Sequence, residues 1–307
     1  MVDFPSGSGS LDYPVLNKKE ETMELINSTS LRCFPPEMDW RECIEAAARS
    51  GYQGIEVNFD GQFELDCSLS TLQELKSCAQ QAGVRIVSVY SRQQWKTPIS
   101  SRDPEKRRRG IQALERLIEI ASCLGAPTIL TIPGAVDNSI LSPDVEILPY
   151  REVYHRVQEV IGDLAKKAES NGVILALENV PNKFLLSPLE FRRFLEELGS
   201  PAVGCHFDVA NCLYGGGYPE DWIRTLGSWI KAVHLKDYKV SVGSLSGFCD
   251  IFEGDVNWKE VCLSLREIGY AGALISEVLP SYKYHPEMLW ETASRAIQKI
   301  IIDIRSH

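Results

Sequence analysis

The sequence predicts an α/β fold, a (β/α)₈ TIM barrel of a single domain, on three observations. Eight short apolar runs alternate with eight longer amphipathic segments between residues 25 and 304. Helix–glycine–strand junctions recur along the chain, as in SGYQGIEV, QAGVRIVSV and SNGVILALE. No GxGxxG or GxxxxGK[ST] loop follows the first predicted strand, which disfavours a doubly wound sheet. The length of 307 residues suits one barrel of about 250 residues.

The predicted strands are short apolar runs, several of them rich in Val, Ile and Thr, as buried parallel strands are. Their ranges are 25–29, 54–58, 85–90, 128–132, 174–178, 203–208, 232–236 and 273–278. The predicted helices follow them at 36–50, 68–82, 103–124, 149–170, 187–198, 219–228, 256–268 and 286–304. Asp103-Pro104 and Ser187-Pro188 each supply an N-cap followed by a proline at the first helical position.

Residues 1–22 differ in composition from the rest of the chain. They are rich in Gly, Ser, Pro and charge, and they show no periodic apolar pattern. They also lack the basic and apolar regions of a signal peptide. We therefore expect a mobile N-terminal extension over residues 1–22 and a barrel over residues 23–307.

Composition and charge exclude several classes of protein. The formal charge of −10 argues against a nucleic-acid-binding or anionic-membrane surface. No segment approaches the roughly 18 consecutive apolar residues of a membrane span. The nine cysteines are scattered and never spaced CxxC, which is typical of buried thiols in a reducing compartment. We expect a cytoplasmic enzyme or small-molecule binder, with no nucleic-acid or membrane partner.

Polar residues end the last four predicted strands, where active sites of such barrels lie. These residues are Glu178, Asp208, His234 and Glu277. Any one of them alone is also compatible with a rim charge or a satisfied core histidine. Together, three carboxylates and one imidazole suit a hard divalent cation, which offsets the cost of burying the charges. We predict one divalent metal ion held by these four residues, Mn²⁺ foremost, with Mg²⁺, Co²⁺ or Zn²⁺ as alternatives.

Four further polar residues stand close to these strand ends and are predicted to bind substrate: Glu56, His206, Asn211 and Lys236. Three of these four residues also fit an ordinary structural role that involves no substrate. His206 also fits a buried histidine bonded to a backbone carbonyl, and Asn211 a helix-cap or turn residue. Lys236 also fits a salt bridge with Asp237 or Glu253.

Five segments of the chain resemble a known superfamily. They are LENVPN (177–182), VGCHFDVAN (203–211), IKAVHLKDYK (230–239), FEGDVNWKEV (252–261) and IGYAGALISEV (268–278). The chain resembles the xylose isomerase-like barrels of sugar and sugar-phosphate isomerases and epimerases. In that superfamily the residues matching Glu178, Asp208, His234 and Glu277 bind the metal. Those matching Glu178 and Glu277 also form the acid/base pair of the ketose 3-epimerases.

The resemblance implies a reaction on a small sugar or sugar phosphate. The metal binds the substrate oxygens and stabilises an enediolate, while Glu178 and Glu277 remove and return the proton. Free-ketohexose 3-epimerases usually carry His and Arg where this chain has Asn211 and Val240. This departure favours a different polyol or its phosphate. Relatives are commonly dimers or tetramers, so a homo-oligomer is expected.

Three other functions compete with an isomerase or epimerase. A dehydratase of the inosose type uses the same barrel and metal but eliminates water. A non-catalytic barrel that binds carbohydrate would keep the site without turnover. An apurinic endonuclease of the same superfamily needs extra histidines on strands two and three, where this chain has Asn58 and Tyr90. Its nucleic-acid substrate also favours a basic protein surface, whereas this chain is acidic.

Overall fold

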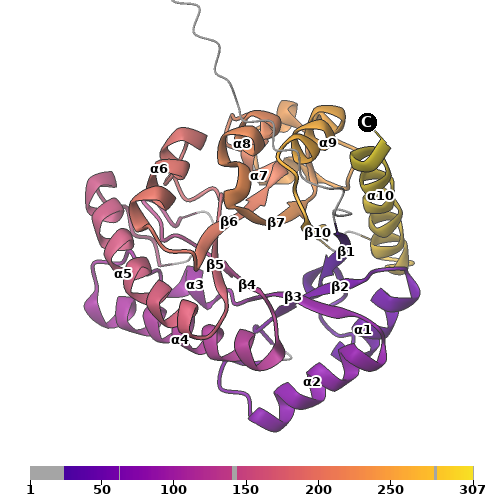
Figure 1. The fold of residues 1–307 in the computed structure, drawn as a ribbon, viewed down its shortest axis with the longest axis horizontal. Coiled ribbons are helices and arrows are strands. Elements are labelled where there is room, and N and C mark those ends of the chain that lie inside the picture. The colour runs from indigo at the N-terminus through magenta and orange to yellow at the C-terminus, as the bar shows by residue number, and fades with distance from the viewer. Residues whose placement is uncertain (1–23, 62, 140–143, 280–281, 307) are drawn as a thin grey trace, which may run out of the picture.

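The computed structural model describes residues 24–61, 63–139, 144–279 and 282–306, and it confirms the barrel. Eight parallel strands close into a ring in the order β1-β10-β7-β6-β5-β4-β3-β2. Figure 1 shows this ring at the centre with the helices around it, and α10 beside β1. The predicted extension over residues 1–22 lies outside the described residues.

The strands fall close to the predicted ranges. The barrel strands are β1 (Leu25–Ser30), β2 (Gly54–Asn58), β3 (Arg85–Tyr90), β4 (Thr128–Thr131), β5 (Ile174–Glu178), β6 (Val203–Asp208), β7 (Ile230–Leu235) and β10 (Gly272–Ser276). The sequence did not predict β8 (Asp237–Tyr238) and β9 (Phe248–Cys249), which form a small antiparallel pair outside the barrel.

Among the described residues, eight α-helices match the predicted ones, and two short α-helices were not predicted. The matching helices are α1 (Trp40–Arg49), α2 (Leu69–Gln81), α4 (Pro104–Leu124), α5 (Tyr150–Ser170), α6 (Pro188–Leu198), α8 (Pro219–Leu226), α9 (Trp258–Glu267) and α10 (Glu287–Ser306). The missed helices are α3 (Gln93–Lys96) and α7 (Val209–Tyr214), which lie in the loops after β3 and β6.

Local side-chain chemistry sets the helix boundaries. Asp103 caps α4 by accepting the N–H of Glu105 at 2.9 Å, and Gly125 ends the helix with a φ of 77° that favours glycine. The first predicted helix begins too early. Asp39 accepts the N–H of Arg41 at 2.9 Å, so α1 starts at Trp40 and the preceding residues form turns.

One large and two smaller clusters of buried apolar side chains stabilise the described part of the barrel. The large cluster lies between the strands and the surrounding helices and holds most of the buried apolar side chains. A smaller cluster contains Val87, Ala232, Ala273 and Ile275. Gly54 borders this cluster, and a Cβ at that position would lie 2.7 Å from Val87 Cγ1, so a side chain there would clash. The polar residues of the site are therefore carried by a packed scaffold.

Asp237 anchors the segment that follows β7. Its side chain is fully buried, and its Oδ1 accepts the N–H groups of Tyr238 at 2.8 Å and Val256 at 3.0 Å. Its Oδ2 accepts the indole N–H of Trp258 at 2.7 Å, at the first residue of α9. One carboxylate thus joins the β8–β9 pair to the start of α9.

Replacing Asp237 by Asn is expected to lower the free energy of unfolding by about 1–3 kcal/mol, because one acceptor oxygen becomes a buried donor facing other donors. Thermal and urea unfolding followed by circular dichroism measure this loss. Asp163→Asn, an exposed position on α5, is the matched control. An Asp237→Asn protein as stable as the wild type would contradict the anchoring role.

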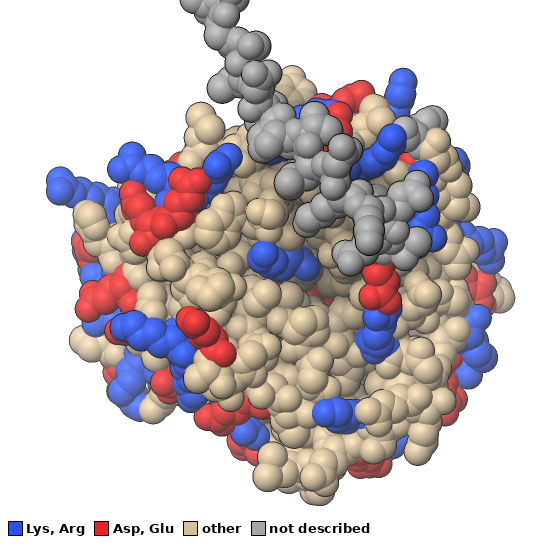
Figure 2. All heavy atoms as spheres, viewed as in Figure 1, with Lys and Arg blue, Asp and Glu red and all other residues tan. Residues whose placement is uncertain are grey.

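The described surface carries mixed charge. In Figure 2, Lys and Arg side chains alternate with Asp and Glu around the molecule, and the described part of this face shows no large patch of one sign. Among the described residues, none of the helices is both long and apolar enough to cross a membrane.

Candidate metal and acid/base site

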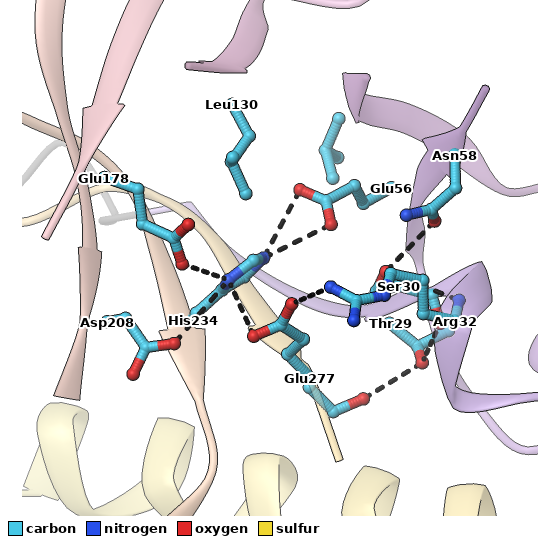
Figure 3. Close-up of polar contacts among 12 residues, drawn as sticks. Thr29, Ser30, Arg32, Glu56, Asn58, Leu130, Glu178, Asp208, His234 and Glu277 are labelled. Carbon is cyan, nitrogen blue, oxygen red and sulfur yellow. Dashed lines mark hydrogen bonds and ion pairs between the residues drawn. The ribbon is translucent and has the colours of Figure 1, made fainter. Parts of the chain in front are cut away.

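The four predicted metal ligands meet at one end of the barrel (Figure 3). Glu178 ends β5, Asp208 ends β6, His234 lies in β7 and Glu277 directly follows β10. One ligand atom from each lies within 4.8 Å of the others. Because the carboxyl ends of parallel strands share one rim of a barrel, residues far apart in sequence converge here.

The imidazole of His234 is the centre of this cluster. Its Nδ1 lies 3.2 Å from Glu178 Oε1, 3.5 Å from Glu277 Oε2 and 3.8 Å from Asp208 Oδ2. All four side chains are buried or nearly so. Oxygen-rich donors with one nitrogen, gathered in a buried place, fit a hard divalent ion such as Mn²⁺ or Mg²⁺.

Glu56 of β2 contacts Nε2, the second ring nitrogen of His234. Its two carboxylate oxygens each lie 3.3 Å from His234 Nε2. A carboxylate there favours a proton on Nε2 and leaves the Nδ1 lone pair directed at the cluster. The side chain of Glu56 is fully buried and is not among the residues that line the cavity above the site. Its contact to His234 suits a positioning role, and the substrate contact stays a prediction.

Replacing Glu56 by Gln is expected to weaken Mn²⁺ binding by about 10–100-fold, because the imidazole loses its charged partner. Calorimetric titration of the metal-free protein with Mn²⁺ measures the change. Glu45→Gln on the exposed side of α1 is the matched control. An unchanged dissociation constant in Glu56→Gln would show that this carboxylate does not orient the ligand.

His206 is a second buried neighbour of His234. It is fully buried, and its ring stands edge-on to His234 with the centroids 4.1 Å apart. Neither ring nitrogen has a hydrogen-bond partner within the described residues, so the backbone-carbonyl alternative is wrong. His206 packs against His234, the predicted metal-ligand histidine, and is not among the residues that line the cavity, so its contact with substrate stays a prediction.

Lys236 and Asn211 do face the cavity, as the predicted substrate contacts would require. The ammonium of Lys236 contacts Asp208 and lies 2.7 Å from Glu277 Oε2. The alternative salt bridges with Asp237 or Glu253 are therefore wrong. The side-chain amide of Asn211 lies 3.5 Å from Glu178 Oε1. It does not cap the helix, since Asp208 caps α7 by accepting the backbone N–H of Asn211.

Arg32 is a site residue that the sequence did not reveal. It follows β1, and its Nη1 donates to Glu277 Oε1 at 2.7 Å (Figure 3). Its guanidinium carbon lies 5.9 Å from the centre of the Tyr90 ring. The available signal was a cation directly after the first strand, in the segment NSTSLRC, at the same rim as the carboxylates.

A cavity of about 340 Å³ opens above the cluster. The polar and charged residues that line it are Glu178, Glu277, Lys236, Asn211, Arg32 and Asp250. Aromatic and aliphatic residues form much of its wall, namely Tyr90, Trp95, Val180, Pro181, Phe248 and Leu279. This combination of a polar floor and an apolar wall is typical of small-molecule sites.

Burial and neighbouring charges shift the pKa values of Glu178 and Glu277 in opposite directions. Burial raises the pKa of Glu178 to about 7. Burial also acts to raise the pKa of Glu277, but Lys236, His234 and Arg32 outweigh it and hold that pKa well below its usual range. For His206, burial lowers the pKa to about 3, which keeps the ring neutral.

The closed barrel and this cluster define a class of (β/α)₈ barrels that carry carboxylates and one histidine together at the carboxyl ends of their strands. The chain belongs to the xylose isomerase-like TIM barrel family, whose sequence pattern matches residues 44–300. The resemblance of the five segments is thereby confirmed.

Relatives and solved structures agree with this family. A putative L-ribulose-5-phosphate 3-epimerase of Haemophilus influenzae is 27% identical over 80% of this chain and 86% of the relative. A 2-epi-5-epi-valiolone 7-phosphate 2-epimerase of Actinoplanes is 27% identical over 63% and 66%. The structure of a D-psicose 3-epimerase of Clostridium cellulolyticum superposes with a TM-score of 0.76 at 20% identity, over 92% of this chain and 99% of that one.

Proposed function

We propose that this protein is a divalent-metal-dependent sugar or sugar-phosphate epimerase or aldose–ketose isomerase. One observation carries the proposal: three carboxylates and one imidazole from four strands lie within 4.8 Å of one another at the floor of a small-molecule cavity. The epimerase names of the sequence relatives support the same class of reaction.

Glu178, Asp208, His234 and Glu277 would hold the metal, with Mn²⁺ as the first candidate. A divalent ion bound there would act as a Lewis acid and stabilise the negative charge that develops on the substrate carbonyl oxygen as a proton leaves the neighbouring carbon. The donor set, its burial and the Glu56 contact to His234 Nε2 all suit such an ion.

Glu178 and Glu277 would move the proton. They come from β5 and from the end of β10, and both line the cavity. An epimerase removes a proton from one face of a carbon and returns it to the other, which requires two bases that approach from different sides. An aldose–ketose isomerase works on one face and needs one of the two glutamates.

Lys236 and Asn211 would contact substrate oxygens. The Lys236 ammonium already lies between Asp208 and Glu277, where it can stabilise a developing oxyanion. The Asn211 amide lines the cavity beside Glu178 and can donate to a sugar hydroxyl.

The test is a screen of ketoses and ketose phosphates with Mn²⁺ in deuterated water, followed by NMR. Epimerisation or isomerisation conserves mass and places deuterium on the carbon beside the carbonyl. A product lighter by one water would replace the proposal with a dehydratase. Binding of sugar without deuterium uptake across the panel would replace it with a non-catalytic barrel.

A further inference from the structure

The charged groups around His234, together with a bound divalent ion, carry no net charge before any substrate binds. Four carboxylates that are buried or nearly so surround His234, from Glu56, Glu178, Asp208 and Glu277. A bound metal keeps its carboxylate ligands ionised, and with all four ionised, Arg32, Lys236 and the divalent ion of the proposed function together carry the same amount of positive charge. An imidazole that binds a metal is neutral, so His234 adds no charge. No positive charge is then left over for an anionic substrate.

Both side-chain cations of the cavity are already paired. Arg32 Nη1 lies 2.7 Å from Glu277 Oε1, and Lys236 contacts both Asp208 and Glu277. Among the described residues that line the cavity, Arg32 and Lys236 are the only cations. A phosphate monoester brings about two negative charges near neutral pH and normally requires cations or helix N-termini to meet it.

The wall of the cavity adds a further negative charge. Asp250 follows β9 and lines the same cavity, beside Phe248 and Cys249. The Tyr282 hydroxyl donates to its Oδ2 at 3.4 Å. A carboxylate can accept hydrogen bonds from sugar hydroxyls, whereas it repels a phosphate at the same distance. The rest of the wall is largely aromatic and aliphatic, which suits the carbon face of a sugar.

We propose that the substrate is an unphosphorylated sugar and that Asp250 is the residue that selects it. This inference rests on the proposed function and deepens it. Asp250 accepts a hydrogen bond from a hydroxyl at the end of the sugar remote from the carbonyl. The charged groups around His234 have no net charge, so the negative charge of Asp250 makes the cavity negative and excludes sugars that carry a terminal phosphate.

The experiment compares ketopentoses and ketohexoses with their own terminal phosphate esters. Binding to the Mn²⁺-loaded protein is measured by calorimetry, and turnover by NMR as above. The wild type should bind and convert the free sugars at least tenfold better than the phosphates. In Asp250→Asn, which removes one charge at constant shape, this ratio should fall by about tenfold or more. Asp163→Asn, the same charge change on the exposed side of α5, should leave the ratio unchanged.

Several outcomes would overturn the inference. Preference of the wild type for the phosphates would overturn it while the proposed function stands, and loss of that preference in Arg32→Met would assign phosphate binding to Arg32. An unchanged ratio in a folded Asp250→Asn protein would remove Asp250 as the selecting residue. If neither free sugars nor phosphates bind or react, the proposed function fails and this inference fails with it.

Discussion

Replacing Glu277 by Gln is expected to reduce proton exchange at the substrate carbon by about 10²–10⁴-fold. Gln keeps the shape and one oxygen of the side chain but has no basic carboxylate to accept the proton. Glu178→Gln should have an effect of similar size if both glutamates act in an epimerisation. Solvent-deuterium uptake by the substrate, followed by NMR, measures the loss directly.

Both glutamates are also proposed metal ligands, so the design must separate the two roles. Each variant is therefore titrated with Mn²⁺ by calorimetry, and exchange is measured at metal concentrations that saturate it. Glu169→Gln on the exposed side of α5 controls for loss of a glutamate charge. Full exchange in a metal-saturated Glu277→Gln protein would remove Glu277 from the acid/base role. Full exchange in Glu178→Gln alone would favour a reaction with a single base.

Removing the metal is expected to abolish turnover, and Asp208→Asn is expected to weaken Mn²⁺ binding by at least 100-fold. Asp208 is fully buried, and Asn would present an N–H donor to the ion and to the adjacent Lys236 ammonium. A chelator should inactivate the wild type, and added Mn²⁺ should restore it. Calorimetry gives the dissociation constants of the wild type and the variant.

Thermal unfolding provides a readout that does not depend on activity. A ligand that binds only the folded state at 100 times its dissociation constant stabilises it by about 2.7 kcal/mol. Mn²⁺ should therefore raise the melting temperature of the wild type and have little effect on Asp208→Asn. Turnover that survives complete chelation, or wild-type affinity in Asp208→Asn, would contradict the metal site.

The regular part of the fold was predictable because its signals are local. Val and Ile runs, the Asp103-Pro104 helix start and the recurring glycines each depend on a few consecutive residues. The errors fell where such signals are short or ambiguous. The β8–β9 pair has two residues in each strand, and Asp39 starts α1 at Trp40 rather than at residue 36, where the predicted helix begins.

The surroundings of the predicted metal ligands are harder to predict from the sequence. The sequence predicts that Glu56 and His206 contact substrate, whereas the structure places both fully buried side chains against His234 and outside the lining of the cavity. The parallel register shifts between Ile55 and Glu56, and again between Cys205 and His206. A shift of this kind moves one strand against its neighbour by a residue and leaves no clear mark in the sequence.

The sequence by itself determined the barrel and the four polar residues at or near the carboxyl ends of its last strands. Strand and helix periodicity are local properties, and parallel strands necessarily bring their carboxyl ends to one rim. Only the tertiary structure decided which groups surround that cluster. Contacts such as Glu56 to His234 and Arg32 to Glu277 join distant parts of the chain, and barrel closure and register set them.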